Sequence, residues 1–221
     1  MERSNKKSEG ENCMAGKEPI EKERKHLIRK LPWEHGIPEI EGEHIQQWYL
    51  DVETIRIDNG IFLMDKRVPE ETLEQIEWRT GGLLAKTLEL PRSAIRVRIK
   101  NQLNAKLELK GPKTGDEGIE LGWELPDTDI SWVREQLSRA GFPSIEKIRW
   151  KIPAKDGYIW EFDIFKGANE GLRIAEIEYE GDRPYDIPDW IGKDVTDDER
   201  LFNQQLATNP ITTWDPMCEY L

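Results

Sequence analysis

The chain has 221 residues, with 44 acidic residues against 32 basic ones and a formal net charge of −12 at pH 7. This acidic balance argues against nucleic acid as a partner, because a nucleic-acid-binding surface needs net or clustered positive charge. No apolar run approaches the ~20 residues of a membrane helix, and the polar N-terminus lacks a signal-peptide core. We therefore expect a cytoplasmic protein with no membrane association.

Residues 1–18 are a run of Ser, Asn, Lys, Glu and Gly without periodicity, and we interpret them as a disordered polar tail. The remaining residues, 19–221, are predicted to form one domain. Cys13 and Cys218 lie near opposite ends of the sequence, which indicates neither a disulfide framework nor a zinc site. Charged residues make up 34% of the chain, yet it contains nine Trp, so a folded domain must accommodate many charges.

The predicted elements are mostly strands, because apolar and charged residues alternate with a period of two from Pro19 onward. On the first strand, Glu21, Glu23 and Lys25 share one face. Six later segments repeat the pattern, with apolar side chains on one face and ionised ones on the other: 95–100, 105–110, 119–125, 148–150, 160–164 and 175–180.

Three helices are predicted between and after these strands. The first covers 69–90, where the pair Gly81-Gly82 is a candidate break. The second is capped by Asp129 and stopped by Gly141. The third opens at Thr196, which stands three residues before Glu199 as in a capping box, and runs through Leu206.

Two interpretations of the alternation remain open at this point. In the first, an antiparallel sheet exposes its charged face to water, which is the commonest cause of such a pattern. In the second, a closed barrel turns its ionised faces inward. The second interpretation accounts better for strands of one sign, because same-sign neighbours confined in a barrel repel strongly unless they meet ions of opposite charge. Arg96 and Arg98 lie on one such predicted strand, and Glu176 and Glu178 lie on another.

The second interpretation also predicts ligands. Glu21, Glu23, Glu176 and Glu178 would offer four carboxylates, the oxygen ligands that hard divalent cations such as Mg²⁺ and Mn²⁺ favour. The basic residues could neutralise phosphate oxygens of a polyanion: Arg96, Arg98, Lys110, Lys147 and Arg149.

These residues carry a resemblance to a known family, the CYTH proteins or triphosphate tunnel metalloenzymes. The matching blocks run in order over roughly residues 19–207: 20–25, 45–50, 96–98, 109–110, 146–150, 160–165, 175–180 and 188–196, followed by Asn203. The chain most resembles the bacterial branch associated with inorganic tripolyphosphate hydrolysis, mainly through its opening motif and the block around Trp190.

The resemblance implies an α+β fold, with a closed antiparallel eight-stranded barrel that encloses a charged tunnel and helices packed outside. It implies Mg²⁺ or Mn²⁺ as cofactor and a small-molecule triphosphate as substrate. Carried over by position, the metal ligands are Glu21, Glu23, Glu176 and Glu178, and Lys25, Glu21 and Glu23 are the catalytic residues. The phosphate contacts are Lys25, Arg96, Arg98, Lys110, Lys147 and Arg149. Glu124, Glu161 and Asp163 either support or hold a second metal, or pair with Lys and Arg.

Two of the chain's departures from the family pattern bear on the choice of substrate. Where relatives carry Arg-x-Glu-aromatic-Glu, this strand has Glu120 and Gly122 in place of the Arg and the first Glu, which removes one phosphate contact. Segment 51–94 is longer than the connection usual in the family, so we expect an insertion beside the tunnel mouth. Three functions stay open: a metal-dependent triphosphatase, a class IV adenylyl cyclase, and a non-catalytic module that binds a triphosphate. A homodimer is one of the assemblies left open.

Overall fold

The computed structural model describes residues 20–67, 71–91, 93–112, 117–179 and 184–215. The predicted tail, residues 1–18, lies outside these ranges. Within them, no helix has the length and apolar character needed to cross a membrane.

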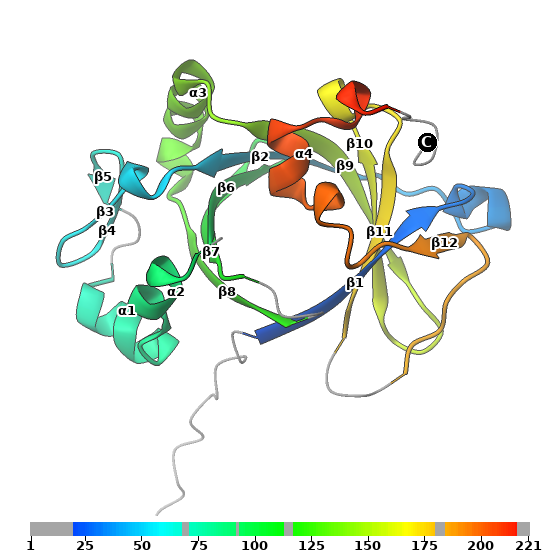
Figure 1. The fold of residues 1–221 in the computed structure, drawn as a ribbon, viewed down its shortest axis with the longest axis horizontal. Helices are drawn as coiled ribbons and strands as arrows, with labels where there is room; N and C mark the ends of the chain where they lie inside the picture. The colour runs from blue at the N-terminus through cyan, green and yellow to red at the C-terminus, as the bar shows by residue number, and fades with distance from the viewer. Residues whose placement is uncertain (1–19, 68–70, 92, 113–116, 180–183, 216–221) are drawn as a thin grey trace, which may run out of the picture.

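Nine antiparallel strands form the main sheet, with neighbours in the order β11-β10-β9-β2-β6-β7-β8-β1-β12 (Figure 1). Their bounds are β1 (Ile20–Ile28), β2 (Glu43–Leu50), β6 (Ala94–Lys100), β7 (Asn104–Lys110), β8 (Glu117–Glu124), β9 (Ser144–Pro153), β10 (Ile159–Phe165), β11 (Arg173–Tyr179) and β12 (Ile191–Asp194). Every segment predicted to be a strand lies in this sheet, because the alternating pattern lets each strand bury one apolar face.

The expected architecture, a closed eight-stranded barrel with helices outside, needs correction. The main sheet has nine strands, and β3, β4 and β5 form a separate three-stranded sheet. The ninth strand arises because β1 is longer than its contact with β8, which ends at Lys22. Beyond that point the same edge pairs with β12, through His26 and Ile28, while the other edge pairs with β11 from Lys22 to Leu27.

The segment between β2 and β6 forms the small sheet and two helices. Its elements are β3 (Ile55–Ile57), β4 (Ile61–Leu63), β5 (Lys66–Arg67), α1 (Leu73–Thr80) and α2 (Leu83–Glu89). The predicted break between the helices is confirmed, since Gly81 and Gly82 both adopt positive φ, 61° and 76°.

This segment covers the apolar outer face of β6, β7 and β8. Leu63 and Ile76 belong to one buried cluster with Val97 and Leu107. Helix α3 (Ile130–Ala140) joins the same cluster through Val133 and related residues, and it ends at Gly141 as predicted. The outer face of the charged strands is therefore an ordinary hydrophobic core, which leaves their ionised side chains to face the opposite way.

The third predicted helix differs from expectation. A 3₁₀ turn over Glu199–Leu201 precedes a short helix, α4 (Asn203–Thr208), and the capping residue of the turn is Asp198. Thr196 forms no capping box. Its hydroxyl oxygen instead accepts a hydrogen bond of 3.0 Å from the backbone N–H of Lys25. This bond joins the loop before α4 to the backbone of β1 at Lys25.

Candidate active site

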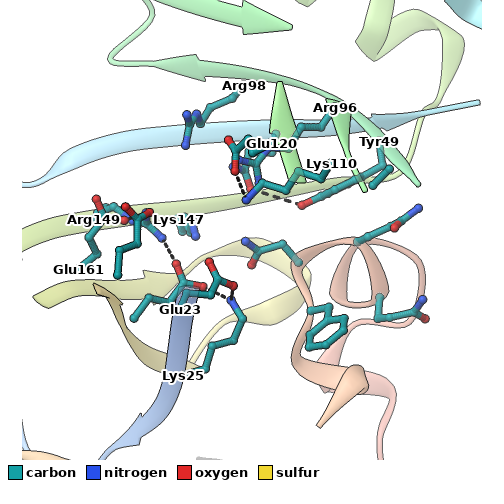
Figure 2. A pocket seen from close by; sticks show the side chains of 18 of the residues that line it. Glu23, Lys25, Tyr49, Arg96, Arg98, Lys110, Glu120, Lys147, Arg149 and Glu161 are labelled. Atoms are coloured by element: carbon teal, nitrogen blue, oxygen red, sulfur yellow. Dashed lines mark hydrogen bonds and ion pairs between the residues drawn. The ribbon is translucent and has the colours of Figure 1, made fainter. Parts of the chain in front are cut away.

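The inner, ionised face of the main sheet lines a pocket of about 880 Å³, with the loop before α4 and α4 itself at one end (Figure 2). All six predicted phosphate contacts line it: Lys25, Arg96, Arg98, Lys110, Lys147 and Arg149. Three of the four predicted metal ligands also line it: Glu23, Glu176 and Glu178. The strands place them there because residues two apart on a strand point to the same face.

Two groups of side chains face one another across the pocket (Figure 2). The first wall comes from β1, β9, β10 and β11 and consists of Glu23, Lys25, Lys147, Arg149, Glu161, Asp163, Glu176 and Glu178. The second wall comes from β2, β6, β7 and β8 and consists of Tyr49, Arg96, Arg98, Glu108, Lys110 and Glu120.

Lys25 lies between two carboxylates of the first wall. Its Nζ is 3.1 Å from Oε1 of Glu23 and donates a hydrogen bond to Glu176. Burial alone would lower the pKa of Lys25, but the negative charges of Glu176 and Glu23 outweigh that effect and raise the pKa above its usual value. Lys25 therefore stays protonated at neutral pH and acts as a fixed cation.

Arg149 holds the first wall together through three carboxylates. Its Nε and Nη2 donate to Asp163 at 2.6 Å each, Nη2 also donates to Glu176 at 2.6 Å, and Nη1 donates to Glu161. Asp163 is fully buried behind the pocket lining and also accepts a hydrogen bond of 2.5 Å from Lys147. Charge-assisted bonds of this kind fix both cations in place.

Lys147 is the cation of this wall that titrates most easily. Burial and the adjacent positive charge of Arg149 lower the pKa of Lys147 to about 8, although Asp163 and Glu176 pull it upward. Glu176 shifts the other way. Burial would raise the pKa of Glu176, but Lys25, Arg149 and Lys147 hold it well below the usual range.

The second wall is organised around Glu108, a carboxylate with 0% exposure. Arg96 Nε donates to Glu108 at 2.7 Å, and Arg98 donates to the same carboxylate. Arg96 Nη2 is also 3.3 Å from Glu120, which pairs with Lys110 as well. Beside them, burial raises the pKa of Tyr49 to about 12, so its hydroxyl stays protonated.

Sequence reasoning missed several residues of the pocket. Glu108 and Glu120 were visible as charged positions in alternating strands, but only the strand register reveals that they face Arg96 and Lys110. At the end of the pocket near α4, the family resemblance had matched Asn203 alone, and the helix was expected to pack outside. Its pocket-lining side chains are Phe202, Asn203, Gln204 and Gln205.

For two predicted residues, the structure gives either a place outside the pocket lining or no described side chain. Glu124 is exposed and does not belong to the lining. Glu21 is described in its backbone alone, which pairs with Gly118 of β8. Of the three supporting carboxylates, Glu161 and Asp163 pair with Lys and Arg, which is one of the two roles expected for them.

The acidic side of the pocket has the donor chemistry for a hard divalent cation. Glu23 of β1 is the direct partner of Glu178 of β11, and two residues further along the strands Lys25 is the partner of Glu176. Like charges directly opposite each other on one sheet face repel. Within the described ranges, however, no cluster of three or more His, Cys, Asp and Glu side chains is arranged as a metal site.

The arrangement suits a small polyanion. Cations from two walls face a common space, and their positions are set by buried carboxylates rather than by flexible surface contacts. A linear anion between the walls would meet guanidinium and ammonium groups from both sides.

Comparison with known proteins found two relatives that are named inorganic triphosphatases. The chain is 41% identical over 118 residues to an inorganic triphosphatase of Acetivibrio thermocellus, covering 53% of this chain and 73% of that protein. It is 26% identical over 145 residues to an inorganic triphosphatase of Nitrosomonas europaea, covering 63% of this chain and 89% of that protein. No protein-family model matches the chain.

Among solved structures, the crystal structure of the inorganic triphosphatase NE1496 matches with a TM-score of 0.48 at 22% identity, over 85% of this chain and 93% of that one. The alignment with the Acetivibrio enzyme covers 73% of that enzyme. In addition, charged residues from the sequence blocks that carried the family resemblance line the same pocket. The chain therefore belongs to the CYTH, or triphosphate tunnel metalloenzyme, family.

Proposed function

We propose that this protein is a metal-dependent triphosphatase that hydrolyses inorganic tripolyphosphate in the pocket between the two walls. The observation that carries the proposal is that six basic side chains, predicted from the sequence as phosphate contacts, all line this one pocket. Its relatives named inorganic triphosphatase support the reaction class and the substrate.

In this proposal the basic side chains bind and orient the triphosphate. Arg149 and Lys147 contact it from the first wall, and Arg96 and Arg98 contact it from the second. Charge that develops on the phosphoryl oxygens is then met by cations already held in position, which is the main catalytic contribution available in phosphoryl transfer. Because the carboxylates Asp163 and Glu108 fix those cations, little reorganisation is needed when the charge develops.

The carboxylates that face the pocket would hold Mg²⁺ or Mn²⁺. Glu23, Glu176 and Glu178 offer oxygen donors, and Glu21 of β1 stays a predicted fourth ligand. When bound, such ions supply charge neutralisation at the phosphate oxygens and an activated water. Lys25 lies between Glu23 and Glu176, and its positive charge lowers the pKa of Glu176, which favours the ionised form that a metal ligand needs.

The first experiment measures orthophosphate, pyrophosphate and cAMP released from tripolyphosphate, ATP and thiamine triphosphate, each with Mg²⁺, Mn²⁺ or EDTA. We expect orthophosphate from tripolyphosphate and its loss in EDTA. Arg96→Ala should abolish most of this activity, whereas Lys86→Met, at an exposed lysine of α2 outside the pocket, should not change it.

The other outcomes contradict the proposal in distinct ways. Production of cAMP and pyrophosphate from ATP would identify a cyclase. Tight tripolyphosphate binding without any product would identify a binding module. Orthophosphate release that persists in EDTA would refute the metal dependence while leaving the substrate in place.

A further inference from the structure

Lys106 is a basic residue of β7 that the sequence analysis did not place in the site. It lines the pocket beside the second wall. In the sheet it is the partner of Arg98 on one side and of Glu124 on the other. Its side chain is 33% exposed and lines the pocket, so it does not belong to the buried core.

Gly122 on the neighbouring strand creates the path that this side chain takes. A Cβ at Gly122 would lie 2.4 Å from Cε and 2.9 Å from Nζ of Lys106, so the lysine lies directly against the glycine backbone. Gly122 is not among the residues with positive φ, which means that the backbone itself does not require glycine. The glycine is needed only for the space that Lys106 fills.

The charge of Lys106 is less neutralised than that of the other cations around it. Its one ion pair among the described residues is with Glu108, at 4.0 Å. By contrast, Arg96 is 2.7 Å from the same carboxylate, and Lys100 is 3.3 Å from Glu43. Arg96, Arg98 and Lys106 therefore share the buried carboxylate of Glu108, which leaves positive charge concentrated at the place where Lys106 faces the pocket.

We propose that Lys106, held in place by the absence of a side chain at Gly122, is an additional phosphate-binding residue of this pocket. It would donate a charge-assisted hydrogen bond to a phosphate of the bound chain, next to Arg98. This inference rests on the proposed function only in the choice of polyphosphate as the ligand. The contact of Lys106 with Gly122 is observed in the structure and does not depend on that choice.

A double-mutant cycle tests the proposal, with tripolyphosphate as the probe. Lys106→Ala should raise KM about tenfold, the effect of one charge-assisted hydrogen bond, with kcat within about twofold. Gly122→Ala should raise KM to a similar degree, because the new methyl group displaces the flexible end of Lys106. In the double variant KM should be no higher than in Lys106→Ala alone, and Lys106→Arg should retain most of the affinity.

Calorimetric binding of tripolyphosphate in EDTA separates this inference from the proposed hydrolysis. If the wild type shows no turnover but its binding weakens about tenfold in Lys106→Ala, the inference stands and the hydrolytic function fails. If the wild type is active and Lys106→Ala changes neither KM nor binding, the inference is wrong and the function stands. Effects of the two single variants that multiply in the double variant would show that Gly122 does not act through Lys106. Absence of both turnover and binding would overturn both.

Discussion

Asp163 offers the sharpest test of how the pocket is built. It is fully buried and accepts hydrogen bonds from Lys147 at 2.5 Å and from Arg149 at 2.6 Å. The substitution Asp163→Asn keeps the shape of the side chain and removes its charge. Two buried cations then lose a counter-ion that water cannot replace.

The expected loss of stability is large for one substitution. Removal of one partner from a buried ion pair costs about 3–5 kcal/mol. The lower value applies here, because Glu176 and Glu161 still pair with Arg149. For a domain of this size, a loss of about 3 kcal/mol corresponds to a decrease in Tm of about 6–12 °C.

The assay is urea denaturation of Asp163→Asn and of Glu124→Gln, which removes an exposed carboxylate outside the pocket lining. The control should change the free energy of unfolding by no more than about 0.5 kcal/mol. Tripolyphosphate should stabilise both variants by binding to the folded state, but it should not close the difference between them, because Asp163 lies behind the pocket lining. A loss below about 1 kcal/mol for Asp163→Asn, or a difference that tripolyphosphate closes, would refute the idea that buried carboxylates hold the cations in place.

Three further predictions concern activity. The affinity for tripolyphosphate should fall as pH rises through about 8, because Lys147 loses its charge there. The variant Lys147→Arg keeps its charge, so its pH profile of kcat/KM should show this fall at a higher pH or not at all. Glu178→Gln should raise the Mg²⁺ concentration for half-maximal activity about tenfold. It should not lower Tm, because Glu178 is exposed, and an unchanged metal titration would exclude Glu178 as a ligand. Glu120→Gln should lower KM several-fold, because Glu120 no longer competes with the substrate for Arg96 and Lys110. Steady-state kinetics at several salt concentrations measures this change, and a higher KM would contradict the prediction.

Much of the fold and of the site could be predicted from the alternation of residues. Arg96 and Arg98 had to share one face of a strand, and the apolar residues between them had to face a core. The one-sign strands favoured an inward direction of the charged faces but left a solvent-exposed sheet as the alternative. The family resemblance then singled out six cations, and the structure places all six around one pocket.

The rest depended on interactions between residues far apart in sequence. Which carboxylate meets which cation is set by strand register, so Glu108 could not be recognised as the partner of Arg96 and Arg98. The strand count depended on β1 having an edge left over for β12. Thr196 had the spacing of a helix cap, but the hydroxyl was better satisfied by the backbone N–H of Lys25, which lies 171 residues away.

The carboxylates of the pocket fall into two kinds according to exposure. Glu108 and Asp163 have 0% side-chain exposure, so no substrate oxygen can take their place. We call these two buried carboxylates anchors, because they stay paired with their cations whether or not substrate is bound. Glu120 and Glu161 have 13% and 17% exposure and reach the pocket surface, where a bound phosphate can compete for the same cations. Substitution of an anchor should therefore lower stability first, whereas substitution of a competing carboxylate should change affinity first. A pocket of this kind can hold many like charges close together, because each buried carboxylate pairs with two or more cations. The more exposed carboxylates Glu120 and Glu161 would release their cations only to a bound polyanion.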